Sequence, residues 1–278
     1  MRVALVQLTT GRDLEANLEL LRARIREAAG RGAEVVVFPE ASMRAFGNSL
    51  VDIAEPLDGP WATAVRAAAD EAGVVVVAGM FTPGDKGAAT TTVRNTLLVH
   101  GRGTDAHYDK IHLYDAFGFK ESDTVTPGTE AVRFTVDGVT FGLATCYDVR
   151  FPALFTANAA AGAQVQIVCA SWGAGPGKAE QWDLLVRARA VDTTSYVLAC
   201  GQSDPAAAGP EAAAAARPGA PTGIGRSAVV DPYGNLVERA GDGPEILYAD
   251  LDLAAVEEAR RTLPVLVNRR LIESGIPG

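Results

Sequence analysis

Short apolar runs alternate along the chain with longer stretches in which apolar residues recur every three or four positions. The short runs are rich in valine and isoleucine, as strands are, and the longer stretches have the periodicity of amphipathic helices. Strands are predicted at residues 2–8, 34–39, 74–81, 93–100, 132–136, 139–145, 165–170, 195–201, 225–231 and 245–251. Helices are predicted at residues 13–30, 60–73, 152–161, 179–192 and 252–262.

Two turn sequences indicate that some neighbouring strands pair as hairpins. Asp137-Gly138 separates the fifth predicted strand from the sixth, and residues 231–235 read Asp-Pro-Tyr-Gly-Asn. Both sequences consist largely of residues that favour tight turns. Crossover units together with hairpins predict an α/β fold with a mixed sheet or two sheets.

The whole chain, residues 1–278, is predicted to form a single domain. No linker or internal repeat interrupts it, and 48% of its residues are apolar, enough for a large core. Residues 204–221 are a low-complexity segment rich in alanine, proline and glycine. Because this segment lacks large apolar side chains to anchor it, we expect a flexible loop there and not a domain boundary.

Charge and cysteine content narrow the functional classes. The formal net charge of −9 argues against nucleic acid or an anionic membrane as the main partner. No apolar stretch approaches the roughly 20 residues of a membrane-spanning helix, and the first residues show no secretory pattern. The three cysteines are too widely spaced for a disulfide framework. We therefore expect a cytoplasmic protein.

The candidate chemistry lies where predicted strands end. Glu40 and Cys146 each follow a buried strand directly, and Lys110 follows a strand and hairpin at 93–108. Ligands in α/β folds bind at the carboxyl ends of strands, so we expect these side chains to converge. A buried carboxylate can take a thiol proton, and the thiolate can then attack an amide carbonyl. Lys110 and the backbone N–H of Tyr147 are the expected donors to the oxyanion.

Each of these residues has a simpler interpretation when it is taken alone. A cysteine at a strand end is more often a packing residue, which is the role expected of Cys169 and Cys200. A single glutamate or lysine is usually solvated. The hypothesis of an active site therefore depends on the three residues occurring together.

A cysteine–histidine hydrolase is the main rival interpretation. All three histidines, at positions 100, 107 and 112, precede Cys146, which excludes a papain-like order. A caspase-like order is compatible with these positions, but its local signature is absent. The histidine spacing does not match a zinc hydrolase, and no glycine-rich phosphate loop occurs. No metal or other cofactor is expected.

Three motifs resemble those of the nitrilase (carbon–nitrogen hydrolase) superfamily, whose catalytic triad is Glu-Lys-Cys. The matching segments are 38–40 (Phe-Pro-Glu), 109–113 (Asp-Lys-Ile-His-Leu) and 145–148 (Thr-Cys-Tyr-Asp). Glu121, ahead of Pro127-Gly128, matches a second glutamate that many members carry. The resemblance implies that Glu121 positions the substrate amide and assists the lysine.

The resemblance covers nearly the whole chain and extends to the Nit branch, which includes deaminated-glutathione amidases and ω-amidases. It implies a four-layer α-β-β-α sandwich, a homodimer formed through helices, and a small-molecule amide substrate cleaved through a cysteine thioester. A true nitrilase, an N-carbamoyl hydrolase and a non-catalytic member of the fold are the alternatives. The chain departs from the family pattern at Ala153, where relatives usually carry glutamate, and in its longer segment at 204–221.

Substrate binding needs a local cation, because the protein as a whole is acidic. Arg150 lies four residues after Cys146, and a guanidinium can bind a carboxylate through two hydrogen bonds. An ion pair with Asp148 or another acid is the alternative role of Arg150. Trp172 follows a predicted strand and is expected either to line the pocket or to pack in the core.

Overall fold

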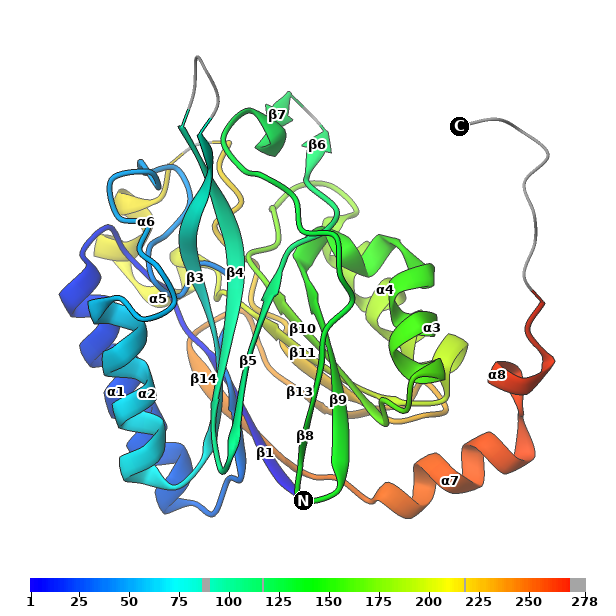
Figure 1. Ribbon diagram of the computed structural model, residues 1–278. Helices are drawn as coiled ribbons and strands as arrows, with labels where there is room; N and C mark the ends of the chain where they lie inside the picture. The colour runs from blue at the N-terminus through cyan, green and yellow to red at the C-terminus, as the bar shows by residue number, and fades with distance from the viewer. Residues whose placement is uncertain (87–90, 117, 218, 271–278) are drawn as a thin grey trace.

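The computed structural model describes residues 1–86, 91–116, 118–217 and 219–270. Two six-stranded sheets lie face to face, and pairs of helices cover their outer faces (Figure 1). The four-layer α-β-β-α sandwich that the resemblance implies is therefore confirmed.

The two sheets have closely similar construction. The first has the order β14-β1-β2-β3-β4-β5 and the second the order β13-β12-β11-β10-β9-β8. The strands of the first are β1 (Arg2–Gln7), β2 (Val35–Val37), β3 (Val75–Lys86), β4 (Thr91–Gly101), β5 (Thr104–Asp109) and β14 (Glu245–Asp250). Those of the second are β8 (Arg133–Val136), β9 (Val139–Thr145), β10 (Val165–Ala170), β11 (Tyr196–Gly201), β12 (Ala228–Val230) and β13 (Leu236–Arg239). Strands β1, β2 and β3 are mutually parallel, as are β9, β10 and β11, and antiparallel strands flank both sets.

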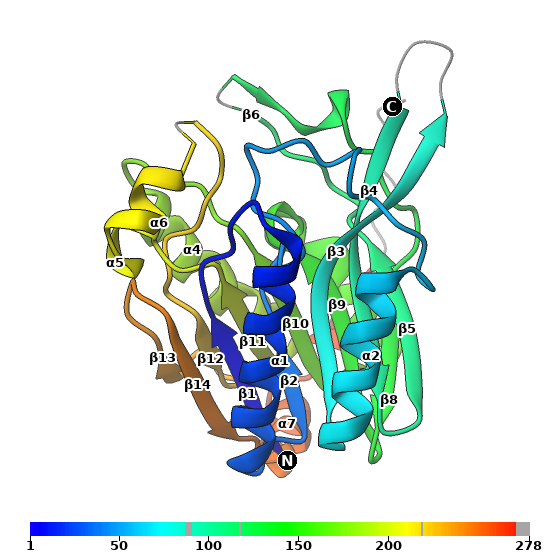
Figure 2. The ribbon, with the colours of Figure 1, turned by 90° about the vertical axis from the view of Figure 1, so that its left-hand side faces the viewer.

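Four helices form the outer layers. Helices α1 (Leu14–Gly30) and α2 (Pro60–Ala72) lie side by side on the first sheet (Figure 2), and α3 (Pro152–Ala160) and α4 (Lys178–Thr193) cover the second. Helix α7 (Leu253–Thr262) follows β14 and buries Val256 and Ala259, and α8 (Val265–Asn268) contacts α3 and α4 (Figure 1). Among the helices described here, none is both long enough and apolar enough to cross a membrane.

Successive side chains of the central strands face opposite layers. Val3 and Leu5 of β1 point into the core between the sheets, whereas Ala4 and Val6 of the same strand pack beneath the helices. Because both faces of these strands are buried, they appear in the sequence as continuous apolar runs without polar alternation.

Every predicted strand and helix has a counterpart, but the structure contains further short elements. They are β5 within the predicted hairpin, β13, the two-residue strands β6 (Asp115–Ala116) and β7 (Phe119–Lys120), and helices α5, α6 and α8. Strands of two residues and helices of one turn are too short to show a periodicity.

The alanine-rich segment differs from the expectation of a plain loop. It contains α5 (Pro205–Ala208) and α6 (Pro210–Ala215). Alanine has the highest helix propensity, each helix begins with a proline, and the Asp204 side chain accepts a hydrogen bond from the first turn of α5. The expected flexibility of this segment stays a prediction.

Candidate active site

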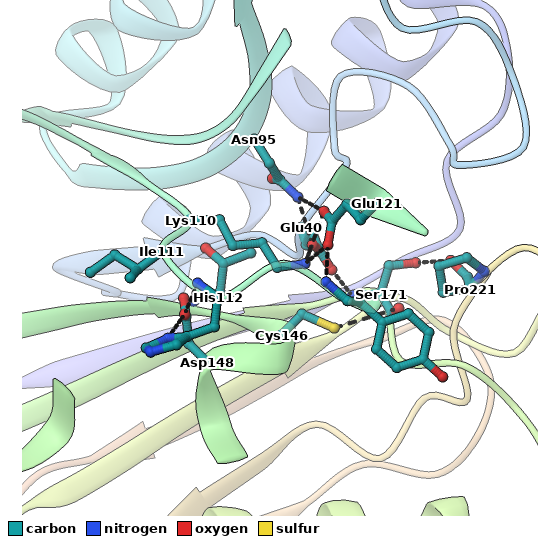
Figure 3. A network of polar contacts seen from close by, with 12 residues as sticks. Glu40, Asn95, Lys110, Ile111, His112, Glu121, Cys146, Asp148, Ser171 and Pro221 are labelled. Carbon is teal, nitrogen blue, oxygen red and sulfur yellow. Dashed lines mark hydrogen bonds and ion pairs between the residues drawn. The ribbon is translucent and has the colours of Figure 1, made fainter. Parts of the chain in front are cut away.

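Three of the predicted site residues come together at the carboxyl ends of three strands, and Ser171 joins them from a fourth (Figure 3). Glu40 follows β2, Lys110 follows β5, Cys146 follows β9, and Ser171, which the sequence did not single out, follows β10. Glu121 begins a short 3-10 helix, Glu121–Asp123. One pocket of about 400 Å³ is lined by all seven predicted site residues: Glu40, Lys110, Glu121, Cys146, Tyr147, Arg150 and Trp172.

The carboxylate of Glu40 is completely buried and fully hydrogen-bonded. Its Oε1 accepts hydrogen bonds from Asn95 Nδ2 at 2.7 Å and from Lys110 Nζ at 3.0 Å, and its Oε2 accepts one from the backbone N–H of Ser171 at 2.8 Å. Burial raises the pKa of Glu40, Lys110 lowers it, and the negative charge of Glu121 raises it again. The net result is a carboxylate that accepts a proton more readily than an ordinary glutamate.

Lys110 lies between two carboxylates. Its Nζ is 3.0 Å from Glu40 Oε1 and 2.9 Å from Glu121 Oε2, and its side chain is 2% exposed. Burial lowers the pKa of Lys110, but the charges of Glu121 and Glu40 outweigh burial and hold the pKa well above its usual value. Lys110 therefore remains protonated and serves as a hydrogen-bond donor, not as a base.

Cys146 begins a second 3-10 helix, Cys146–Arg150, in a left-handed backbone conformation with φ of 48°. Residues other than glycine rarely adopt this conformation, and such strain is often found at functional sites. Burial raises the pKa of the Cys146 thiol well above its usual value; Glu40 adds to this shift and Lys110 opposes it. The resting thiol is therefore neutral, and forming the thiolate requires a nearby base.

Asn95 on β4 is a member of the site that sequence reasoning missed. Its Nδ2 donates to Glu40 Oε1 at 2.7 Å and to Glu121 Oε1 at 3.3 Å, and its backbone carbonyl oxygen accepts a hydrogen bond from the backbone N–H of Lys110 at 2.9 Å. There is no distinct signal for Asn95 in the sequence, because polar residues flank it on both sides in β4.

Asp148 links two segments of the site, a role that the sequence did not predict. Its Oδ1 accepts a hydrogen bond from the backbone N–H of His112 at 2.9 Å. Its Oδ2 accepts hydrogen bonds from the Tyr108 hydroxyl at 2.6 Å and from the backbone N–H of Thr145 at 2.8 Å. This buried carboxylate therefore ties the segment that carries Lys110 to the turn that carries Cys146.

Arg150 does not use Asp148 as its partner. Its Nη2 donates to Gln181 Oε1 at 2.7 Å, and its guanidinium lies 5.1 Å from the ring centre of Trp172. Trp172 is 5% exposed and lines the pocket while it packs against Trp182, so both roles expected of it apply. Ala153, in contrast, is exposed in the first turn of α3 and is absent from the pocket lining.

The pocket combines aromatic walls with positive charge. Tyr114, Phe119 and Tyr147 line it together with Trp172, and Lys178 also lines it, in addition to Lys110 and Arg150. Within the described part of the chain, no three His, Cys, Asp or Glu side chains are grouped so that they could hold a metal ion. The arrangement can move a proton between a thiol and a carboxylate and can stabilise negative charge beside the sulfur.

Comparisons with a family model and with individual known proteins all indicate the same family. The carbon-nitrogen hydrolase family model matches residues 2–261. A hydrolase of Mycobacterium tuberculosis is 54% identical over 97% of this chain and 95% of its own length. A deaminated glutathione amidase of Escherichia coli O157:H7 is 31% identical over 97% of both chains, and the omega-amidase NIT2 of Mus musculus is 32% identical over 97% of this chain and 95% of its own.

The solved structure of Nit3 from Saccharomyces cerevisiae, described as a member of branch 10 of the nitrilase superfamily, has the same fold. It superposes with a TM-score of 0.80 at 29% identity, covering 98% of this chain and 97% of that chain.

Proposed function

Since the chain belongs to the carbon–nitrogen hydrolase (nitrilase) superfamily, in its Nit branch, and is a hydrolase acting on amides, we propose that it cleaves them through a Cys146 thioester. The observation that carries this proposal is that Cys146, Glu40 and Lys110 are all buried and line the same pocket.

Glu40 acts as the base in the first half of the reaction. It takes the proton of the Cys146 thiol, and the sulfur bonds to the amide carbon. Lys110 Nζ and the N–H of Tyr147 stabilise the negative charge on the carbonyl oxygen, a contribution of about 3–4 kcal/mol per donor in related chemistry. When the tetrahedral intermediate collapses, the C–N bond breaks and the amine leaves with the proton held by Glu40.

Water completes the reaction. Glu40, now ionised again, takes a proton from a water molecule whose oxygen attacks the thioester carbon. The C–S bond breaks, the acid is released, and the proton returns to the Cys146 sulfur. Glu121 holds Lys110 through two hydrogen bonds of 2.9 and 3.1 Å, so the lysine keeps its position and its charge through both halves.

The substrate class follows from the cations in the pocket and from the names of the relatives. We infer a small amide whose acyl part carries a carboxylate, held by Arg150 over Trp172. A deaminated glutathione and an ω-amide of a 2-oxo acid both fit this description.

The test is to offer deaminated glutathione and 2-oxoglutaramate separately and to measure the release of cysteinylglycine and ammonia. We expect at least one of them to be hydrolysed, and Cys146→Ala to lose essentially all turnover. Substantial activity in Cys146→Ala contradicts the thioester. Activity only on nitriles or carbamoyl amines contradicts the substrate class.

We further propose that two copies pair through α4. Leu184 and Val191 of α4 are 68% and 40% exposed, and they lie two helical turns apart on the same face. Helix α8, whose Val267 is 78% exposed, lies close to α3 and α4. A second copy would cover these apolar side chains.

A further inference from the structure

The turn that carries Glu40 has an unusual backbone. Ala41, the next residue, is buried and adopts a left-handed conformation with φ of 60°. Residues other than glycine rarely adopt this conformation, so the surrounding structure must hold the turn in place. Cys146 is in the left-handed region as well, so both partners of the proposed proton transfer lie in backbone that depends on its neighbours.

Two buried side chains hold the Glu40 turn. Gln202 Nε2 donates a hydrogen bond to the backbone carbonyl of Glu40 at 3.0 Å, and the Thr10 hydroxyl donates one to the backbone carbonyl of Ala41 at 3.1 Å. The peptide groups before and after the left-handed residue therefore each meet a side-chain donor.

Thr10 and Gln202 also bind each other. Gln202 Nε2 donates to the Thr10 hydroxyl at 3.0 Å, and Gln202 Oε1 accepts a hydrogen bond from the backbone N–H of Thr10 at 3.1 Å. Because a backbone N–H can only donate, it determines which end of the Gln202 amide faces it and so directs Nε2 toward the Glu40 turn.

The pair of Thr10 and Gln202 connects the two sheets. Thr10 lies in the segment after β1 of the first sheet, and Gln202 directly follows β11 of the second. Glu40 follows a strand of the first sheet and Cys146 a strand of the second, so the proton passes between groups that different sheets carry. A connection between the sheets beside Glu40 therefore influences the distance from the base to the thiol.

We propose that Thr10 and Gln202 are positioning residues, which hold the Glu40 turn so that its carboxylate stays within reach of the Cys146 thiol. The inference rests on the proposed function, in which Glu40 is the base. Among the described residues that line the active-site pocket, neither Thr10 nor Gln202 occurs; both line a neighbouring hollow. Loss of the pair should therefore lower kcat and leave KM nearly unchanged.

Thr10→Val tests the proposal. Valine has nearly the shape of threonine but no hydroxyl, so the Ala41 carbonyl loses its Thr10 donor and Gln202 Nε2 loses an acceptor. We expect kcat to fall about tenfold, because small misplacements of a catalytic group have effects of this order. Thr10→Ser keeps the hydroxyl and should retain the kcat of the unmodified enzyme.

Thr193→Val is the matched control. The Thr193 hydroxyl is also buried, and it donates to the backbone carbonyl of Arg189 in α4 at 2.7 Å. Its loss should lower the melting temperature and leave kcat unchanged. A fall in kcat that is equal in Thr10→Val and Thr10→Ser, or equal in Thr10→Val and Thr193→Val, overturns the inference.

Crystal structures of the variants separate this inference from the proposed chemistry. We expect the Glu40 carboxylate to shift by about 0.5 Å or more in Thr10→Val and to keep its place in Thr10→Ser. A turn that stays in place in Thr10→Val overturns the inference, whatever the value of kcat. If the turn moves and kcat is unchanged, the pair does hold the turn, and it is the role of Glu40 as the base that fails.

Discussion

At the scale of single residues, the acid–base balance of the site depends on Asn95. Its amide donates to the carboxylates of Glu40 and Glu121 and so favours their ionised forms. Glu40 must be ionised to take the thiol proton, so activity falls as the pH drops through the pKa of Glu40, which burial already raises. Asn95→Ala should raise that pKa further and move the acidic limb of the kcat/KM profile to higher pH by roughly one unit.

A second buried asparagine provides the control for Asn95. Asn158 is fully buried in α3, its Nδ2 donates to the carbonyl of Leu143 at 3.4 Å, and it does not line the pocket. We expect Asn158→Ala to lower the melting temperature without moving the acidic limb. If the limb stays in place in Asn95→Ala as well, Asn95 is only a packing residue.

Two of the principal site residues were predictable because each directly follows a strand whose apolar run marks it in the sequence. Glu40 and Cys146 carry that signal, whereas Lys110 was placed only by the strand and hairpin at 93–108 that precede it. Asn95 and Asp148 carry no such signal, because their importance comes from partners 26 to 55 and 36 to 40 residues away. No local pattern records which distant backbone N–H groups meet a given carboxylate in the folded chain.

At the scale of elements, β3 determines where Glu40 lies. Gly79 of β3 faces the turn after β2, and a Cβ at this position would lie 2.7 Å from the Ala41 nitrogen and 2.8 Å from the Pro39 oxygen. In Gly79→Ala the turn must move, and Glu40 moves with it. We expect kcat to fall by roughly 10- to 100-fold, because small misplacements of a catalytic group have effects of this size. Steady-state kinetics on a hydrolysed amide measures it.

Gly30 gives the matched substitution for Gly79. A Cβ at Gly30, the last residue of α1, would meet nothing within 4 Å. Gly30→Ala should therefore leave kcat unchanged and raise stability by about 0.4–1 kcal/mol. A fall in kcat in both variants, or in neither, would show that contact with the Glu40 turn is not what matters at Gly79.

The helices and strands also show how far the fold could be predicted from the sequence. Long elements such as α1 and β9 were predictable because their periodicity persists over many residues. The α5 and α6 pair was missed because low complexity was taken to mean a loop, although alanine favours helix wherever a cap and a first-turn proline begin one. The stacking of two sheets could not be derived from periodicity, since a strand buried on both faces has the same appearance in any sheet.

At the scale of the whole molecule, net charge and local charge have opposite signs. The surface repels anions at long range, because the net charge is −9, while the active-site pocket presents Arg150 and Lys178. Selection of an anionic substrate therefore depends on contacts within about one Debye length, roughly 8–10 Å at ordinary salt. A dimer that leaves this end of the sandwich open would not change that selection.

Leu184 tests the proposed pairing of two copies. It is 68% exposed on α4, and covering such a side chain in an interface is favourable because apolar surface leaves water. Leu184→Glu would place a charge in that contact, where it has no partner and must lose its hydration. We expect the dimer dissociation constant, measured by analytical ultracentrifugation, to rise by at least tenfold, a change of about 1.4 kcal/mol.

Val51→Glu is the matched control. Val51 is 43% exposed and lies outside α4, so the same substitution there should leave the dissociation constant unchanged. An unmodified protein that sediments as a monomer at micromolar concentration, or equal weakening by both substitutions, would show that the apolar face of α4 is not the contact.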